Sequence, residues 1–442
     1  MNDIIKAVEK HRQLIFETER FIWKHPETGY KEKVTSKYME DSFINLGYEI
    51  IRAEGITGFY TFIDTGREGP EILVLGELDS IICPSHKESD PKTGAVHSCG
   101  HNAQCAALVG IAAALKEPGI LDKFCGRIRL CAVPAEELLE IDYRSKLIKD
   151  GIIKYMGGKP EFLSRGYFDG VDIAFMVHTS SSFAARKGSV GCIAKKILYK
   201  GVSSHAGGSP WNGRNALYAA TCGINAANAL RETFKESDII RFHPIVTHGG
   251  EIVNAIPELV QIESYVRGSS YEGIIEANKK INQALCGAAL SIDTNVEIID
   301  IPGYAPLKND PNMITMAEEA IKLAVPDADF SYSDVIGSGS TDMGDLSCIM
   351  PVIHPYAGGA TGNSHGNNYQ IADPEAACVS SAKWQLAMLL ILLSDGGKRA
   401  KEIIDNYTPM YASKEEYLNY IDKLNRTGNR IVYTDGKAEV IL

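Results

Sequence analysis

Residues 97–102 read His97-Ser98-Cys99-Gly100-His101-Asn102 and follow a strand-like apolar run, Glu71 to Leu78, and a loop. A helix-like stretch, Ala103 to Leu115, begins directly after them. This order of strand, loop and helix is typical of an α/β domain, whose ligands gather at the carboxyl ends of the strands. Glycine between Cys99 and His101 lets a thiolate and an imidazole converge without a bulky Cβ in the way. The stretch therefore predicts an α/β fold with a metal-type pair of side chains beside a strand end.

A carboxylate pair follows the next predicted strand. Apolar runs predict strands at Gly58 to Ile63, Arg127 to Val133 and Val171 to Val177, and Pro134-Ala135-Glu136-Glu137 follows the second of them. Adjacent carboxylates can point in different directions, so one can bind a metal while the other moves a proton. Most such pairs are solvated surface features. A carboxylate drawn inside needs a partner, however, and a divalent cation is a natural one.

Two histidines extend the set of metal-type side chains. His178 follows Val177 directly, although a lone histidine there is a core or loop residue in most proteins. His365 follows Gly358-Gly359, where the backbone is loose enough to bend a ligand toward a site. Cys99, His101, Glu137, His178 and His365 together are most simply interpreted as a two-metal hydrolase site. A His-Glu-x-x-His motif is lacking, which argues against a zincin.

The order of predicted strands and helices changes from about Lys187, which predicts a second domain. The expected elements are a strand at Gly191 to Tyr199, a helix at Arg214 to Arg231, strands at Ile239 to Thr247 and Val260 to Arg267, a helix at Glu272 to Leu290 and a strand at Asn295 to Ile301. This order is typical of a ferredoxin-like α+β sandwich. We therefore expect a catalytic domain with a mixed sheet flanked by helices at residues 1–187 and 304–442, and an inserted ferredoxin-like domain at 188–303.

The chain ends carry simpler patterns. Residues 3 to 24 predict an amphipathic opening helix, and Glu375 to Leu393 predict a helix of small and apolar residues. The tail from Ser394 onward is more polar and suggests no function.

Bulk composition narrows the class of protein. The 442 residues are 45% hydrophobic and 23% charged, as in soluble globular proteins, and their number favours two domains. A formal charge of -11 without a block of Lys and Arg argues against nucleic acid or an acidic membrane surface as a partner. Ten cysteines without a Cys-x-x-Cys pair predict buried thiols rather than a disulfide framework. The N-terminal residues lack the pattern of a signal peptide, and no apolar run approaches the ~18 residues that span a bilayer, so a cytoplasmic protein is expected.

The inserted domain contains three further candidates. His205 lies in the glycine-rich stretch Ser203 to Pro210, which is either an ordinary loop or a loop that presents an imidazole to a carbonyl. Asn254 and Arg267 are equally open to a structural role. They are nevertheless the side-chain types that hold an amide oxygen and a carboxylate.

These motifs together resemble the aminoacylase and bacterial carboxypeptidase family of two-metal amidohydrolases. The likeness spans nearly the whole chain, including Gly250-Glu251-Ile252-Val253-Asn254-Ala255-Ile256-Pro257. It is closest to the branch with a cysteine ligand, which includes hippurate hydrolases, aminobenzoyl-glutamate hydrolase and a related dipeptidase. Gly339-Ser340-Thr341-Asp342-Met343-Gly344-Asp345 looks particularly like the last two.

The resemblance implies an assignment for each candidate. Cys99 would bridge two divalent ions, Zn or Mn first and Co or Ni as further possibilities, and Glu136 would be the general base. The remaining ligands would be His101, Glu137, His178 and His365. Family enzymes are commonly dimers through the inserted domain, and the histidine that matches His205 reaches the partner subunit's site. Asn254 and Arg267 match substrate-binding positions, and Asp79 would orient a metal ligand.

The expected reaction is hydrolysis of an amide between an acyl, aminobenzoyl or aminoacyl group and an amino acid with a free carboxylate. The substrate would be a small N-acyl amino acid or a dipeptide. The sequence departs from the family pattern in three places: Asn102 replaces Asp, Glu77-Leu78-Asp79 replaces Asp-x-Asp, and the segment from Glu137 to His178 is longer. These departures bear on which substrate is bound more than on which reaction is catalysed. The rival predictions are an inactive small-molecule-binding homologue and an aminopeptidase that acts on longer peptides.

Overall fold

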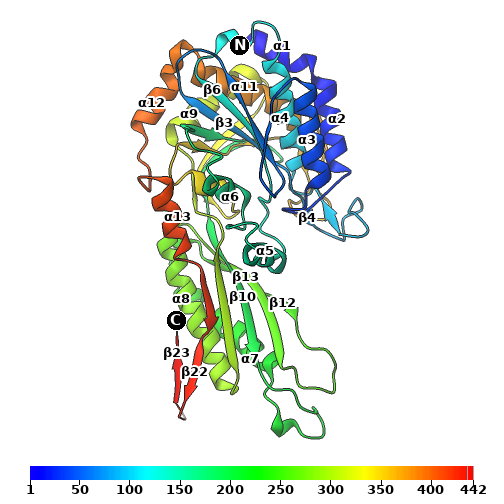
Figure 1. The fold of residues 1–442 in the computed structure, drawn as a ribbon, viewed down its shortest axis with the longest axis vertical. Coiled ribbons are helices and arrows are strands. Elements are labelled where there is room, and N and C mark those ends of the chain that lie inside the picture. The colour runs from blue at the N-terminus through cyan, green and yellow to red at the C-terminus, as the bar shows by residue number, and fades with distance from the viewer. Residues whose placement is uncertain (436, 442) are drawn as a thin grey trace. The chain divides into compact units, whose positions relative to one another are not determined.

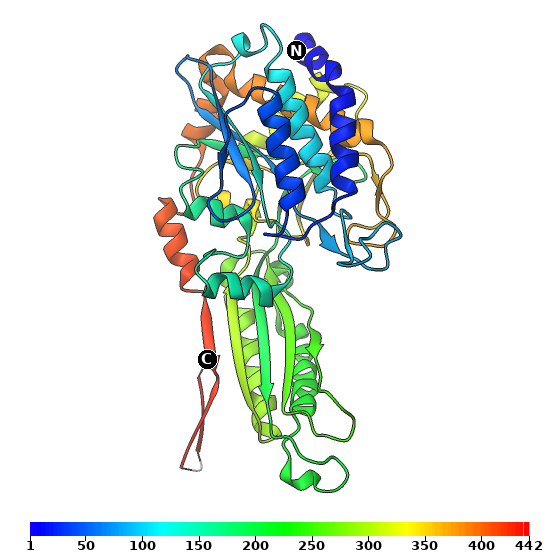
Figure 2. The same cartoon turned by 45° about the vertical axis from the view of Figure 1, so that its right-hand side comes forward.

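The computed structural model describes residues 1–435 and 437–441, which form two compact units. The first unit contains Met1–Gly188, Leu307–Gly337 and Thr341–Lys414. The second contains Ser189–Pro306, Ser338–Ser340 and the chain from Glu415 onward. Figure 1 and Figure 2 show the ribbon from two sides.

A six-stranded mixed sheet lies at the centre of the first unit (Figure 1). Its order is β1 (Ile51–Arg52), β2 (Phe59–Asp64), β6 (Arg127–Val133), β3 (Glu71–Glu77), β7 (Ile173–Phe175) and β17 (Val352–Ile353). Strand β3 runs parallel to both β6 and β7, whereas β2 runs antiparallel to β6. All residues of β3 are buried, as expected for a parallel strand covered on both faces. The predicted mixed α/β sheet is confirmed, with β7 shorter than its apolar run.

Helix α4 (His101–Leu115) packs on β3 and is buried along its whole length. Helices α1 (Asn2–Lys10), α2 (Arg12–Trp23) and α11 (Ser381–Leu393) pack against it. Small residues permit this close packing, because a Cβ on Gly110 would lie only 2.5 Å from Ile15 Cδ1 of α2. The single opening helix predicted for residues 3 to 24 is wrong in one respect. The chain breaks at His11, whose Nε2 lies 2.9 Å from Glu117 Oε1.

Shorter elements surround this core. The remaining helices of the first unit are α3 (Lys33–Asn45), α5 (Ile141–Lys149), α6 (Gly158–Ser164), α9 (Pro311–Ala324), α10 (Met343–Leu346) and α12 (Lys398–Asn406). Its other strands are β4 (Ile81–Ile82), β5 (Ala95–Val96), β8 (His178–Thr179), β9 (Phe183–Ser189), β15 (Leu307–Lys308), β16 (Phe330–Gly337), β18 (Tyr356–Ala357), β19 (Ala360–Thr361) and β20 (Gln370–Ile371).

The helical segment Glu375–Leu393, which includes α11, is long and apolar enough to cross a membrane by length and composition. Within the described residues, however, 78% of its apolar window is buried inside the protein. Trp384 and Leu386 belong to the hydrophobic core that also contains α4. Burial of this kind is typical of a core helix, and the helix predicted over 375–393 is confirmed.

The second unit is an antiparallel sheet covered by two helices. Its strands are β10 (Gly191–Lys200), β11 (Arg241–Phe242), β12 (Ile245–His248), β13 (Leu259–Gly268) and β14 (Asn295–Pro302), and its two long helices are α7 (Ala216–Ala229) and α8 (Tyr271–Ser291). Buried and less buried residues alternate along β13, as expected for a sheet with one face on the core. The predicted ferredoxin-like order of strands and helices is confirmed.

The C-terminal residues differ from the predicted division of the chain, which left everything after residue 303 in the first domain. From Glu415 onward they belong to the second unit. The reason is strand pairing, because β21 (Arg426–Asn429) adds to the open edge of β14. Helix α13 (Lys414–Asp422) precedes β21, and a hairpin of β22 (Ile431–Thr434) and β23 (Lys437–Val440) follows it.

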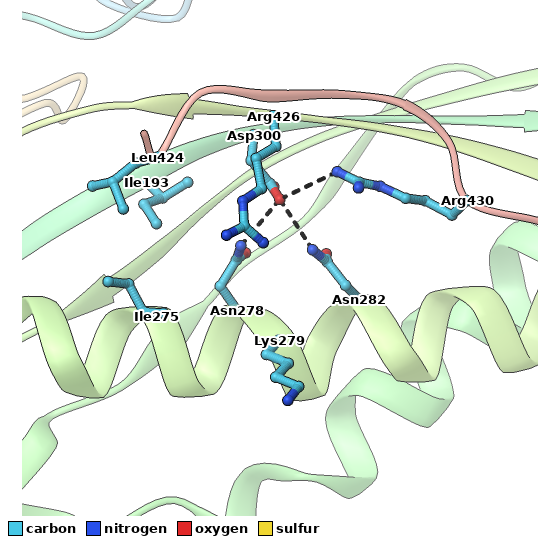
Figure 3. Close-up of a pocket in the computed structure, with 9 residues that line it drawn as sticks. All are labelled: Ile193, Ile275, Asn278, Lys279, Asn282, Asp300, Leu424, Arg426 and Arg430. Atoms are coloured by element: carbon cyan, nitrogen blue, oxygen red, sulfur yellow. Dashed lines mark hydrogen bonds and ion pairs between the residues drawn. The ribbon is translucent and has the colours of Figure 1, made fainter. Parts of the chain in front are cut away.

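The tail also contributes to a buried charge cluster beside a cavity of about 290 Å³ (Figure 3). Asp300 on β14 accepts hydrogen bonds from the Nδ2 atoms of Asn278 and Asn282 at 3.1 and 3.0 Å. Lys195 pairs with the same carboxylate, and the Arg430 Nη2 lies 3.8 Å from it. A buried carboxylate is stable only when it is compensated in this way, so the tail helps to hold the second unit together.

Candidate metal centre

Cys99, His101 and His178 meet at the carboxyl end of the parallel strands. His101 is the first residue of α4, and His178 follows β7 in the short strand β8. The Cys99 Sγ lies 3.4 Å from the His178 Nε2. One donor atom from each of the three residues lies within 4.8 Å of the other two. A sulfur and two imidazole nitrogens at this spacing are suited to an ion such as Zn²⁺.

A second group forms around the same sulfur. The His365 Nε2 lies 3.4 Å from Cys99 Sγ and 2.9 Å from Glu137 Oε1. The donor atoms of Cys99, Glu137 and His365 again lie within 4.8 Å of one another. His365 has a positive φ of 62°, and its backbone N–H donates to the Ser98 carbonyl at 2.8 Å. The structure thus brings the five predicted metal-type residues together, with Cys99 common to both groups.

Asp79 contacts two members of the cluster. Its Oδ1 lies 3.2 Å from His101 Nδ1, and its backbone carbonyl oxygen lies 2.9 Å from the same nitrogen. Its Oδ2 accepts the backbone N–H of Glu137 at 2.8 Å. Because Nδ1 of His101 is engaged in this way, Nε2 is the nitrogen left to face the other donors.

Backbone geometry explains two of the residue types in the motifs. Gly100 has a φ of 90°, and a Cβ there would lie 2.5 Å from the Tyr369 Oη. Glycine is therefore required between Cys99 and His101. Ala135 also has a positive φ, of 57°, and its N–H donates to Glu32 Oε1 at 2.8 Å. This contact helps to hold a strained turn directly before the two glutamates.

The two adjacent glutamates have opposite electrostatic environments. Burial, followed by the charges of Glu77 and Glu137, raises the pKa of Glu136 well above its ordinary value. Burial opposes ionisation of Glu137 as well, but the neighbouring His365 lowers the pKa of that carboxyl to about 2. Pairs of carboxyl groups whose pKa values are pushed apart are typical of acid–base sites.

The thiol of Cys99 ionises easily for a buried cysteine. Burial and Glu137 both oppose its ionisation, yet His101 and His178 lower its pKa to about 6. The thiolate is the form that binds metal ions. The site is therefore electrostatically prepared for a cationic partner.

Two observations test whether divalent cations fit these residues. Tetrahedral Zn²⁺ separates a sulfur and a nitrogen ligand by about 3.6 Å, close to the 3.4 Å between Cys99 Sγ and both His178 Nε2 and His365 Nε2. The His101 Nε2 is buried and has no hydrogen-bond partner among the described residues. A cation would supply the partner that this nitrogen lacks, so the donor set fits a metal pair.

Four residues beside the cluster were not identified from the sequence. The Lys159 Nζ lies 2.5 Å from Glu77 Oε1 and pairs with Asp342, and all three side chains are fully buried. His354 lies with its ring centroid 5.5 Å from that of His178, and burial lowers its pKa to about 3. Lys159 is 82 residues from Glu77 and 183 from Asp342. Glu77 and Lys159 lie in stretches that depart from the family pattern, which was the only signal for them, and Asp342 lies in the stretch that resembles the family.

His205, Asn254 and Arg267 belong to the second unit. The His205 Nδ1 accepts the N–H groups of Gly207 and Gly208 at 3.1 and 2.8 Å, and its side chain is exposed. The Asn254 carbonyl accepts the N–H of Ala206 at 2.9 Å, so the loops that carry His205 and Asn254 lie side by side. Arg267, on β13, donates from Nη1 to Ser340 Oγ at 2.9 Å.

Comparison with known proteins gives matches over most of the chain. The Xaa-Arg dipeptidase of Mus musculus is 32% identical over 269 residues, which cover 59% of this chain and 57% of that protein. A p-aminobenzoyl-glutamate hydrolase chain of Escherichia coli (strain K12) is 27% identical over 303 residues, covering 66% and 58% respectively. The chain therefore spans less than two thirds of the length of these relatives.

A solved structure shares the fold. The crystal structure of a dinuclear metal binding peptidase of the M20 family from Bacillus subtilis aligns with a TM-score of 0.63 at 19% identity. The alignment covers 87% of this chain and 99% of that one. Residues 74–390, well over half of the chain, match the sequence model of Peptidase family M20/M25/M40. The resemblance found from the motifs is thereby confirmed, and the chain belongs to Peptidase family M20/M25/M40.

Proposed function

We propose that the protein is a metal-dependent amidohydrolase. It would cleave the amide between an acyl, aminobenzoyl or aminoacyl group and an amino acid with a free carboxylate. The observation that carries this proposal is the sharing of Cys99 by two donor groups, with Glu136 Oε2 only 3.9 Å from His101 Nε2. Similarity to a dipeptidase and to an aminobenzoyl-glutamate hydrolase supports a small N-acyl amino acid or a dipeptide as the substrate.

The proposed metal ligands are the five clustered residues. Cys99 would bridge two divalent ions, and His101, Glu137, His178 and His365 would complete their coordination. Mixed sulfur, nitrogen and oxygen donors suit Zn²⁺, while Mn²⁺, Co²⁺ and Ni²⁺ are further candidates. Elemental analysis of the purified protein tests this proposal.

In the proposed mechanism, Glu136 moves the proton. When bound, the two cations would acidify a water molecule toward a pKa of about 7 and polarise the scissile carbonyl. Glu136 takes the proton of the attacking water and passes it to the leaving amine, a task for which a raised pKa suits it. Asp79 keeps the His101 Nε2 turned toward the cluster throughout.

His205 and Asn254 would stabilise the oxyanion of the tetrahedral intermediate. The His205 Nδ1 accepts two backbone N–H groups, so the neutral ring has its proton on Nε2. That N–H and the Asn254 amide are hydrogen-bond donors of the kind used in oxyanion holes. Each such donor contributes roughly 3 to 4 kcal/mol in well-studied hydrolases.

Arg267 would hold the free carboxylate of the substrate. Arg267→Gln is expected to raise KM for N-acyl amino acids by about 10- to 100-fold, since a hydrogen bond to a charged group contributes about 1.5–3 kcal/mol. The matching carboxamides should be affected much less, because they lack the carboxylate. Steady-state kinetics on both substrate series measures the difference, and Arg241→Gln on β11 of the same sheet is the control. An equal loss for acids and carboxamides would indicate that Arg267 only supports the fold.

We also propose a homodimer that forms through the second unit. Large apolar side chains are exposed there, among them Trp211 at 78%, Ile245 at 62% and Val253 at 100%. Strand β12, which contains Ile245, is an edge strand, and such edges are suited to pairing with another chain. Sedimentation of the whole protein should give the mass of two chains.

A reducing, cytoplasmic location is proposed as well. The ten cysteines are all free, which is typical of proteins in a reducing compartment.

A substrate panel distinguishes the proposed reaction from its rivals. Metal-loaded protein is tested against N-acyl amino acids, aminobenzoyl-glutamate, dipeptides and unblocked oligopeptides. Cleavage of the first three classes supports the proposal, and cleavage of oligopeptides alone favours an aminopeptidase. Binding without turnover, equal in the wild type and in Glu136→Gln, favours an inactive binding homologue.

A further inference from the structure

Glu77, the last residue of β3, places a carboxylate oxygen against His101. The Glu77 Oε2 lies 3.3 Å from the His101 Nε2, and both side chains are fully buried. Neither atom has a hydrogen-bond partner among the described residues. The two atoms lie within ion-pair distance but lack the geometry of a hydrogen bond, and a cation between them would give each buried atom a directed partner.

The spacing of these two atoms suits a cation between them. A nitrogen and an oxygen that each lie about 2.1 Å from a tetrahedral Zn²⁺ are about 3.4 Å apart. Glu77, His101 and Glu136 also offer donor atoms within 4.8 Å of one another, as do Cys99, His101 and His178. His101 is common to both sets, so a cation bound to its Nε2 would face the Glu77 oxygen as well as the Cys99 sulfur.

Lys159 fixes the other oxygen of Glu77. The Lys159 Nζ lies 2.5 Å from Glu77 Oε1 and also pairs with Asp342. The Lys159 backbone N–H donates to Asp342 Oδ2 at 2.9 Å, so both ends of the lysine are anchored. Gly158 brings the start of α6 close to the segment before Glu136, since a Cβ there would lie 1.7 Å from the Pro134 carbonyl oxygen. Because Lys159 holds Oε1 of Glu77, the Oε2 of the same carboxylate faces His101.

We infer that Glu77 is a further donor to the cation held through His101, and that Lys159 is a positioning residue that holds Glu77 for this role. This inference rests on the proposed metal-dependent function, to which it adds a carboxylate beyond the five predicted ligands. The ligand class is a divalent transition-metal ion, and Zn²⁺ is the probe. Lys159 also offsets the negative charge that the additional carboxylate brings into the buried site.

The first test measures Zn²⁺ affinity in the whole protein. Chelator-stripped wild type and Glu77→Gln are titrated with Zn²⁺ against a competing indicator. Glu77→Gln is expected to weaken one of the two sites by about 10- to 100-fold and to leave the other nearly unchanged. The visible absorption spectrum of the Co²⁺-loaded protein should change as well, because that spectrum reports the coordination of the ion directly.

The control is Glu71→Gln. Glu71 lies at the other end of β3, is buried, and is paired with Arg129, so it matches Glu77 in strand, burial and charge. Its substitution should leave both Zn²⁺ affinities and the Co²⁺ spectrum unchanged. If Glu77→Gln does not fold, Glu77→Asp, which shortens the side chain by one methylene, takes its place. Weakened binding in Glu77→Asp supports the inference, and wild-type affinity at both sites overturns it.

The second test asks whether Lys159 acts through Glu77. Lys159→Met alone is expected to weaken the same Zn²⁺ site. In a Glu77→Gln background it should add less than about a twofold effect, since the two residues act as one unit. Equal effects of Lys159→Met in both backgrounds would overturn the positioning role, and wild-type metal binding by Glu77→Gln would overturn the ligand role. A wild-type protein that binds no Zn²⁺ would instead reject the proposed function itself.

Discussion

Replacing Glu136 with glutamine is expected to lower kcat for amide hydrolysis by about 10²- to 10⁴-fold, the usual contribution of a general acid–base group. Glutamine preserves the size of the side chain, but it can neither accept nor return the proton. Burial, followed by Glu77 and Glu137, raises the pKa of Glu136, so a neutral amide relieves repulsion between like charges. The variant should therefore unfold at a temperature no lower than that of the wild type. Steady-state kinetics and calorimetry measure the two effects.

The dependence on pH separates proton transfer from a structural effect of Glu136→Gln. A general base acts when it is deprotonated, so wild-type activity should fall as the pH falls through the pKa of Glu136. The residual activity of Glu136→Gln should lack that fall. Glu140→Gln is the control, because Glu140 follows in the same segment but pairs with Lys31 away from the cluster. Less than a tenfold loss of kcat in Glu136→Gln would contradict the assignment of the base.

The second large effect is expected for Cys99→Ala. Its sulfur belongs to both donor groups, so its removal takes one donor from each ion. We expect both metal affinities to fall together. The loss of cation chemistry costs several kcal/mol of transition-state stabilisation, or about 10³-fold or more in kcat/KM. Metal content by elemental analysis and kinetics at a fixed Zn²⁺ concentration measure this change.

Cys131→Ala is the matched control for Cys99→Ala. Cys131 lies in the neighbouring strand β6, is fully buried, and has a thiol pKa that burial raises rather than lowers. Its replacement removes a similar small side chain and should leave the metal content of the protein unchanged. Retention of both ions by Cys99→Ala, or loss of only one, would contradict the bridging role of this sulfur.

Local patterns in the sequence predicted the framework of the site well. The apolar runs that become β3 and β6 end where the chain turns toward Asp79 and Glu136, and parallel strands bring such ends to one edge. Cys99 and His101 are neighbours in sequence, so their convergence depends only on the backbone of Gly100. These features follow from periodicity and turn chemistry within a few residues.

Features that depend on distant pairing were not predictable in this way. Lys159 shares no local pattern with Glu77 or Asp342, and only the folded chain brings the three charges together. Strand β21 was unrecognised because its pairing is decided by the open edge of β14 rather than by its own sequence. The resemblance to a family assigned His205, Asn254 and Arg267, and Arg267→Gln tests the assignment of the last of them.

The separation of 266 residues between Cys99 and His365 has a consequence for the order in which the cluster forms during synthesis. A nascent chain emerges from the ribosome with its N-terminal end first and folds progressively. Cys99, His101 and His178 have left the ribosome while His365 is still being translated. Of the two donor groups, only the one that these three residues form could therefore bind an ion early. The proposed activity would therefore switch on late in translation, after the Ser98 carbonyl has captured the loop that carries the final imidazole.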